Sequence, residues 1–231
     1  MNTLQAGCVT TNKVAAGMGT VNVNGGTLVV NTCLALTRPS SLGSDPGALA
    51  SFTGTLNLKG GTVWANTIIK GGGVATITMT NATLVVTVTN TIGTLSFPIS
   101  TLSLADSTLQ LPVSAAAPTA ATTSLATGGL TNVLNIAAVP AITNYPAQFP
   151  LLKYTKLNGA FNFGLGALPP PPAPDYGAYL SNNTPNSSVD LVLAGVRPTI
   201  ATQPAPFFRS KGSQKTGIPL ASEFNSKSRP Y

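Results

Sequence analysis

A twelve-residue pattern occurs four times in this sequence and constrains the fold more than any other feature. The copies span residues 19–30, 54–65, 75–86 and 100–111, and they read GTVNVNGGTLVV, GTLNLKGGTVWA, ATITMTNATLVV and STLSLADSTLQL. The second and ninth positions are threonine in every copy. Internal repetition of this kind is the signature of architectures in which similar units stack on one another. We therefore expect the four copies to stack.

Apolar residues alternate within each copy, at positions three and five and again at positions ten and twelve. In the second copy these residues are Leu56, Leu58, Val63 and Ala65. Alternation with period two is typical of a strand with one buried face, so each copy predicts two short strands. Two such strands are only marginally stable alone. Stacked copies would align their aliphatic side chains in inner ladders about 4.8 Å apart, with threonine ladders on the outside.

The seventh position of the pattern determines how the two strands of a copy are joined. It holds Gly25, Gly60, Asn81 and Asp106. These residue types are the ones that best tolerate a positive φ, so we expect a sharp corner at each of them. The sequence thus predicts an all-β fold, a parallel β-solenoid whose coils contain one copy each.

The rest of the chain divides by composition into further segments. We assign residues 1–128 to the solenoid coils and residues 129–196 to a β-rich C-terminal cap, because seven of the fourteen aromatic residues fall between Tyr145 and Tyr179 and an open solenoid end needs a cover. Residues 197–231 lack hydrophobic periodicity. They carry six Lys or Arg and one Glu, hence +5 of the total charge of +7, and they predict a basic, disordered linker or tail.

Local patterns predict the remaining elements. Proline, serine and glycine indicate a loop over residues 34–53, and low complexity indicates another over residues 114–128. Alternation over residues 94–99 predicts a third strand, which would give a coil a roughly triangular section. Within the cap, strands are predicted at 130–136, 149–154, 161–165, 179–181 and 189–193.

The repeats resemble a known family. GTVNVNGGTLVVN and GTLNLKGGTVWAN resemble the passenger-associated, or autotransporter-associated, β-strand repeat of large bacterial surface and secreted proteins. LLKYTKLNGAFNFGLGALP and LSNNTPNSSVDLVLAG are similar to the segment that often ends such arrays, so the resemblance covers residues 19–196. It implies a right-handed parallel β-solenoid (β-helix) displayed outside the cell as a stalk or adhesin passenger. Members of the family share no catalytic motif, so no functional residue is carried over.

Residue types that common catalytic and metal sites require are scarce. The chain has no histidine, which is the commonest general base and transition-metal ligand. Two cysteines alone cannot form a structural zinc site. The five carboxylates are far apart in sequence, at Asp45, Asp106, Asp175, Asp190 and Glu223. We therefore expect no catalytic residue, no metal and no cofactor, and we predict that the protein is not an enzyme.

Trp64 is the one candidate for ligand binding in the repeats. It occupies the eleventh position, which points outward, and Val29 and Val85 occupy the same position in other copies. An apolar outer stripe needs a cover or a partner. We expect the loop over residues 34–53 to cover it, and the alternative is that Trp64 forms a stacking platform for a sugar ring.

Cys8 and Cys33 lie 25 residues apart, which is one coil length. If they occupy equivalent positions in adjacent coils, their Cα atoms would lie about 5 Å apart, within the range that a disulfide accepts. The alternative is two separate buried thiols.

Three hypotheses for function follow. The first is a non-catalytic structural or adhesin-like passenger segment of a bacterial surface or secreted protein, with extracellular glycans or cell-surface components as partners. The second is a carbohydrate-binding or carbohydrate-active β-helix protein of pectate-lyase-like type, and the third is a spurious or truncated reading frame. The sequence predicts no nucleic-acid partner and no membrane-spanning helix. The resemblance implies an extracellular or cell-surface location. Residues 1–19 show no export signal, so we expect the signal to lie outside this sequence, together with further repeats or domains on either side.

Overall fold

The computed structural model describes residues 1–7, 17–37, 52–88, 91–170 and 174–196. Within these ranges the chain forms fifteen strands and no helix, which confirms the predicted all-β class. All of the described residues belong to one compact unit, which ends at Pro198. The predicted tail at 197–231 lies outside the described residues, as do residues 38–51 of the predicted loop at 34–53.

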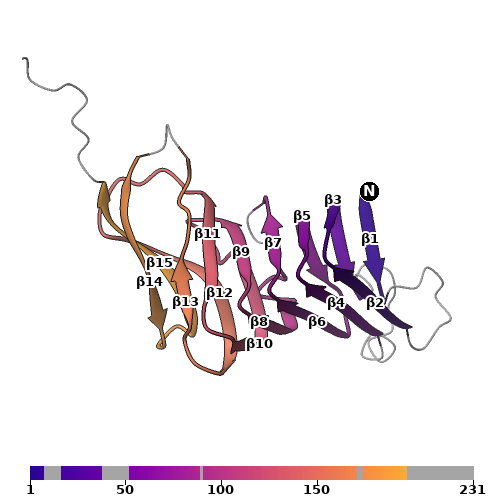
Figure 1. Ribbon diagram of the computed structural model, residues 1–231. Coiled ribbons are helices and arrows are strands. Elements are labelled where there is room, and N and C mark those ends of the chain that lie inside the picture. Colours follow the sequence, from indigo (N-terminus) through magenta and orange to yellow (C-terminus); the bar gives the residue numbers. More distant parts are fainter. Residues whose placement is uncertain (8–16, 38–51, 89–90, 171–173, 197–231) are drawn as a thin grey trace, which may run out of the picture. The chain divides into compact units, whose positions relative to one another are not determined.

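The strands form two sheets, and from β1 to β14 the chain passes alternately from one to the other (Figure 1). The seven-stranded sheet, here called the odd sheet, contains β1 (Thr3–Ala6), β3 (Thr27–Leu36), β5 (Thr62–Lys70), β7 (Thr83–Val86), β9 (Thr108–Pro112), β11 (Asn132–Ala138) and β13 (Phe163–Leu165). The eight-stranded sheet, here called the even sheet, contains β2 (Gly17–Asn24), β4 (Phe52–Lys59), β6 (Val74–Thr80), β8 (Ile99–Ala105), β10 (Ala120–Gly128), β12 (Ala147–Asn158), β15 (Ser188–Val196) and β14 (Tyr176–Asn183). An even strand up to β12 and the odd strand that follows it make one layer.

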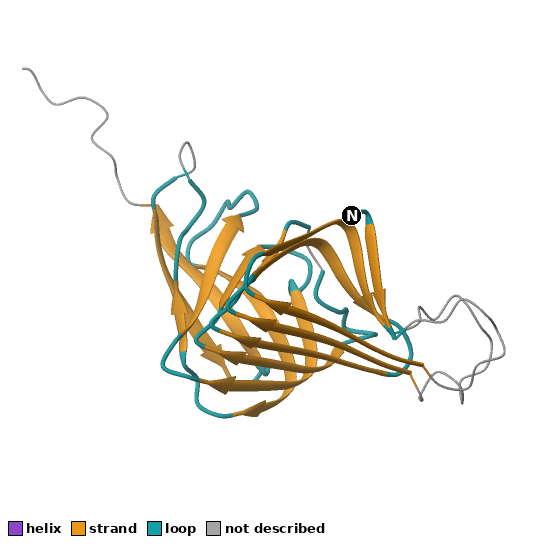
Figure 2. Cartoon of the chain, turned by 45° about the vertical axis from the view of Figure 1, so that its right-hand side comes forward, coloured by secondary structure: helices purple, strands orange, loops and turns teal. Residues whose placement is uncertain are grey.

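Strand register matches the alignment of the four sequence copies position by position. In the even sheet the second-position residues are consecutive neighbours: Thr20, Thr55, Thr76 and Thr101. In the odd sheet the ninth-position residues are consecutive neighbours: Thr27, Thr62, Thr83 and Thr108. All of these pairs are parallel, and Figure 2 shows the strands of the layers side by side. The predicted parallel, in-register pairing of the copies is confirmed.

The aliphatic side chains of the pattern form the core between the sheets. One row in the even sheet and one row in the odd sheet are fully buried: Leu56, Ile77, Leu102 and Leu125, and Val63, Leu84, Leu109 and Leu134. Each such side chain contributes about 1.5–3 kcal/mol through burial. The rows become more open at the first layer, where Val21 and Leu28 are only half-buried.

Ordered pairing continues beyond the fourth copy. Residues 114–128 were predicted to form a loop, but β10 pairs in parallel with both β8 and β12, so the prediction is wrong for 120–128. Ser124 and Leu125 pair with Thr101 and Leu102, so they occupy the outer and inner positions of the pattern. Small residues carry little hydrophobic signal, yet they fit a strand whose neighbours on both sides already bury its inner face.

The predicted third strand at 94–99 is not formed. Residues 95–97 form a bend, and only Ile99 belongs to a strand, β8. Pro98 has no N–H group to donate to a neighbouring strand. Ile92 occupies this side instead and makes single parallel bridges to Ile68 and Ala120. The predicted loop at 34–53 is also shorter than expected, because residues 34–36 continue β3 and residues 52–53 begin β4.

Among the described strands, antiparallel pairing is confined to the C-terminal part of the even sheet. All five strands predicted between residues 129 and 196 are present, as β11, β12, β13, β14 and β15. β11 and β12 extend the parallel pairing past residue 128, and β13 pairs in parallel with β11. β15 then pairs antiparallel with β12, and β14 antiparallel with β15. Within the described even sheet, β14 therefore runs in the same direction as β12, and β15 alone runs opposite to the other strands.

The described part of the chain contains no helix with the length and hydropathy needed to cross a bilayer.

Candidate functional site

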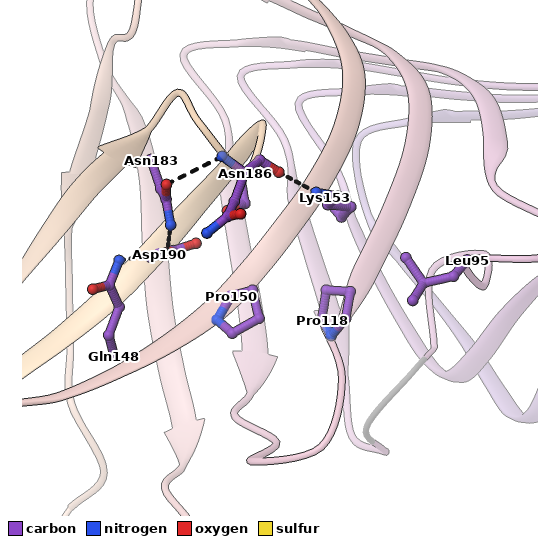
Figure 3. A pocket seen from close by; sticks show the side chains of 9 residues that line it. Leu95, Pro118, Gln148, Pro150, Lys153, Asn183, Asn186 and Asp190 are labelled. Carbon is purple, nitrogen blue, oxygen red and sulfur yellow. Dashed lines mark hydrogen bonds between the residues drawn. The ribbon is translucent and has the colours of Figure 1, made fainter.

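A pocket of about 410 Å³ lies beside the antiparallel strands (Figure 3). Its polar lining comes from β12, β15 and the end of β14 with the turn that follows it: Gln148, Lys153, Asn183, Asn186, Ser188 and Asp190. Its apolar lining consists of Leu95, Pro118 and Pro150. The volume falls within the range of about 300–1,000 Å³ that is typical of small-molecule sites. We call it the Asp190 pocket.

An irregularity in β12 brings the lining residues of that strand to one side. The register between β12 and β15 shifts between Pro150 and Leu152, and Leu151 and Leu152 are both fully buried. A bulge of this kind re-aims the side chains that follow it. Lys153 therefore lines the same pocket as Gln148 and Pro150, although strict alternation would place it on the opposite face. Proline fits next to a bulge because it has no N–H for the ladder.

Asp190 is the central polar residue of the pocket. It lies in β15 directly opposite Pro150 of β12 and Ser181 of β14, and its side chain is only 2% exposed. Its Oδ2 atom accepts hydrogen bonds from Gln148 Nε2 at 2.6 Å and from Asn183 Nδ2 at 2.7 Å. Its Oδ1 atom is buried and has no hydrogen-bond partner among the described residues. An unpaired buried polar atom costs about 1–3 kcal/mol, so this carboxylate reduces the stability of the free protein.

The turn between β14 and β15 is tied to the pocket by further hydrogen bonds. Asn183 uses both ends of its amide, since its Nδ2 donates to Asp190 and its Oδ1 accepts from the backbone N–H of Asn186 at 3.3 Å. Lys153 Nζ donates to the backbone carbonyl of Asn186. Ser187, the next residue, has a φ of 47°. These contacts hold the turn over one side of the pocket.

A second, smaller pocket of about 170 Å³ shares Leu95 and Lys153 with the Asp190 pocket and includes Tyr154 in its lining. The Tyr154 hydroxyl donates to Asn182 Oδ1 at 3.2 Å, and the residue is 7% exposed. Burial raises the pKa of the Tyr154 phenol above its usual value, and the negative charge of Asp190 raises it further. Tyr154 therefore remains a neutral hydrogen-bond donor at physiological pH.

Charges in the Asp190 pocket balance. Its lining contains one carboxylate, Asp190, and one ammonium group, Lys153, while its other polar side chains are amides and a hydroxyl. None of the described lining residues is a second carboxylate, which acid and base catalysis of glycoside cleavage would require. The arrangement suits binding of a polar ligand through hydrogen bonds.

Trp64, predicted either to be covered or to bind sugar, does not line either of these pockets. It lies in β5 between Val29 and Val85 of the neighbouring strands, and it is 43% exposed. Val29 is 47% exposed, but Val85 is buried. Asn66, two residues further along the same strand, donates to the carbonyl of Asn31 and accepts from Thr87 Oγ1. The Asn66 side chain is therefore engaged by adjacent layers of the stack.

Each of the four predicted corner residues has a positive φ: Gly25 81°, Gly60 67°, Asn81 48° and Asp106 48°. Successive corners are linked by backbone hydrogen bonds, for example from Gly60 N to Thr80 O at 3.0 Å. Asp106 has a second role that the sequence does not indicate. Its Oδ1 atom accepts from the backbone N–H groups of Leu130 and Thr131, at 2.6 and 3.3 Å, in the longer corner of the next layer.

Cys33 is half-buried in β3, where it pairs with Thr3 of β1 and Thr67 of β5. Its equivalent in the preceding strand is thus Thr3. Cys8 lies outside the described residues, so its disulfide with Cys33 stays a prediction.

The sequence does contain one signal for the Asp190 pocket. Asp190 is a single charge inside the apolar run VDLVL, directly after the turn-forming residues NTPNSS. A charge inside an apolar strand is normally buried only when it is hydrogen-bonded or functional. Its partner Gln148 lies 42 residues away in sequence, so local patterns cannot identify the pair.

No group of three or more His, Cys, Asp or Glu residues in the described ranges is arranged to hold a metal ion. A scan against protein-family models and searches of curated proteins and of solved structures find no match to this chain.

Proposed function

We propose that this chain is a right-handed parallel β-solenoid that serves as a non-catalytic, structural or adhesin-like segment of a bacterial surface or secreted protein. The observation that carries the proposal is the agreement between the sequence repeats and the strand register. The same position of the pattern pairs with itself from β2 through β8 and from β3 through β9. A chain that contributes one strand to each sheet per layer is expected of a solenoid.

Ends of the stack differ in a way that supports a capped solenoid. β2, the edge strand of the even sheet at the first layer, has neither charge nor proline. At the other end the antiparallel strands β15 and β14 follow the last parallel strand. These two strands occupy the edge of β12 with which a further parallel coil would have to pair. Residues 176–196 are thus the part of the proposed cap that ends the parallel stack.

Side chains on the outside of the layers suit a rigid supporting element. Hydrogen bonds link outward-facing residues of adjacent layers, including Asn57 Nδ2 to Asn22 Oδ1 at 2.9 Å and Thr67 Oγ1 to the carbonyl of Thr32 at 3.2 Å. Such bonds are each worth about 0.5–1.5 kcal/mol and add to the backbone ladder. The resemblance of the repeats to the passenger-associated β-strand repeat supports the location outside the cell.

A carbohydrate-binding β-helix is the second candidate. The Asp190 pocket favours it, because amide and carboxylate groups converge there beside apolar side chains. The carbohydrate-active form of this hypothesis would need a cluster of acids. The three described carboxylates lie in different elements: Asp106 in a repeat corner, Asp175 just before β14 and Asp190 within β15.

Cell fractionation tests the proposed location. Antibodies raised against residues 17–196 should label intact cells or the culture supernatant of the bacterium that encodes the chain, and external protease should remove the cell-bound signal. Labelling confined to lysed cells would contradict the proposal.

Incubation with pectin and polygalacturonate should yield no unsaturated or reducing sugar products, whereas product formation that requires Asp190 would favour the carbohydrate-active alternative.

A further inference from the structure

We propose that the Asp190 pocket binds one residue of a neutral saccharide. In this arrangement Asp190, Gln148 and Asn183 contact ring hydroxyls, and Leu95, Pro118 and Pro150 pack against the C–H face of the ring. The inference deepens the adhesin-like function proposed above and rests on it for its biological setting.

The first argument is the unused hydrogen-bonding capacity of the site. Two amide groups converge on a single carboxylate oxygen, Asp190 Oδ2, and the other oxygen, Oδ1, is buried without a partner. A ligand hydroxyl would supply the missing donor and remove the cost of leaving this oxygen unpaired. Gln148 and Asn183 each use one amide N–H toward Asp190, which leaves each a second N–H for a ligand oxygen. A polyhydroxylated ligand offers both donors and acceptors at this spacing.

The second argument is the balance of charge. Asp190 and Lys153 both line the pocket. An amine ligand would meet the ammonium group of Lys153, and a carboxylate or phosphate ligand would meet Asp190. Like charges in a partly desolvated site repel strongly enough to reduce affinity. The pocket therefore favours a ligand without net charge.

The third argument is the separation of polar and apolar walls. Figure 3 shows Asn183, Asn186, Gln148 and Asp190 gathered on one side, while Pro150, Pro118 and Leu95 follow one another along the other. Leu95 is 61% exposed in the free protein, so ligand contact would remove apolar surface from water. Ligand sites typically combine such apolar surface with a few polar groups that set orientation. A pyranose ring, with hydroxyls at its rim and C–H groups on its faces, matches both walls.

Titration of the full ¹⁵N-labelled chain with sugars tests the proposal. The neutral probes are D-glucose, D-galactose, D-mannose and N-acetyl-D-glucosamine, and the charged comparators are D-glucosamine and the uronic acids of glucose and galactose. At least one neutral sugar should shift the side-chain amide signals of Gln148 and Asn183 in a saturable way. Its charged counterpart should bind at least about tenfold more weakly. No saturable shift with any neutral sugar, or tighter binding of a charged comparator, would overturn the proposal.

Three variants separate the pocket from the rest of the surface. Asp190→Asn should abolish the saturable shift, because the amide presents a donor where the ligand hydroxyl needs an acceptor. Leu95→Ser should weaken binding at least about threefold, because the ligand would no longer bury this apolar side chain. Folding should be retained, because the side chain is mostly exposed in the free protein. Trp64→Ala should leave binding unchanged. Unchanged binding in either folded pocket variant, or binding that is lost with Trp64→Ala, would refute the assignment.

Leu95→Ser decides the matter if Asp190→Asn does not fold, since unchanged binding in that variant contradicts the apolar wall. The sugar titration is independent of the location test. A protein found only in lysed cells would refute the proposed location and leave the titration result standing, whereas a failed titration would leave the structural role intact.

Discussion

Truncation of one inner-ladder residue provides the sharpest test of how the layers are stabilised. Leu102 of β8 is fully buried and pairs with Ile77 on one side and Leu125 on the other. Leu102→Ala removes three carbon atoms, and at about 0.8 kcal/mol per buried methylene the transfer cost is about 2.4 kcal/mol. Neighbours on both sides restrict collapse around the cavity, which adds roughly 1–2 kcal/mol. We expect the free energy of unfolding to fall by about 3.5–4.5 kcal/mol.

Leu28→Ala is the matched control, because Leu28 belongs to the same pattern but lies half-buried in the first layer. Fewer of its contacts are lost, so we expect a cost of about 1–2 kcal/mol, from the smaller area buried. Equilibrium urea unfolding followed by circular dichroism measures both, and an unchanged m-value shows that the same transition is compared. Equal costs for the two variants, or a cost below about 1 kcal/mol for Leu102→Ala, would contradict a ladder that is buried in the middle and open at the end.

Further predictions concern the corners, the pocket and its neighbour Tyr154. Gly60→Ala should lower the free energy of unfolding by about 1 kcal/mol, because a residue with a Cβ is strained at the φ of 67° found here. No atom lies within 4 Å of an added Cβ, so the variant tests backbone strain alone. Asn81→Gly, at an equivalent corner, should cost less than about 0.5 kcal/mol in the same urea assay. Asp106→Ala should cost about 1–2 kcal/mol, since two backbone N–H groups lose their acceptor, and their amide hydrogen exchange should accelerate. The pKa of Tyr154, followed by phenolate absorbance, should lie above the usual value of 10.0. Asp190→Asn should lower it only in part, because burial, the larger cause, remains. The pKa of Tyr154 is higher in the folded state than in the unfolded state, so its contribution to the free energy of unfolding should be fully present below about pH 10. This contribution should be lost as the pH rises through the folded-state pKa. A free energy of unfolding that increases over that pH range would contradict the prediction.

The Asp190 pocket illustrates how a stability cost can indicate a binding site. A buried carboxylate with one unpaired oxygen destabilises a fold that has few other charged groups. Strands β12 and β15 could pair equally well around an apolar residue at this position. Retention of a carboxylate there is consistent with a ligand that completes its hydrogen bonds.

Much of the parallel architecture could be predicted because the information is local and repeated. Alternation with period two assigns each side chain to a face, and a shift by one residue would turn the inner row outward. Thr20, Thr55, Thr76 and Thr101 therefore align in the structure as they align in the sequence. The positive φ at Gly60 and Asn81 was likewise predictable, because few residue types tolerate it. Where large apolar residues are sparse, as in β10, the same reasoning failed.

Only the tertiary structure decided where the C-terminal strands go and what they bring together. Alternation predicts a strand at 189–193 but not its direction, because an apolar run fits either a parallel or an antiparallel neighbour. Antiparallel pairing with β12, together with the bulge after Pro150, places Asp190, Gln148 and Lys153 around one pocket. Gln148 and Asp190 are 42 residues apart in sequence. Such non-local contacts form only when the core assembles, so no local pattern specifies them. The sequence alone therefore determined the repeated layers, and the assembled fold determined the site.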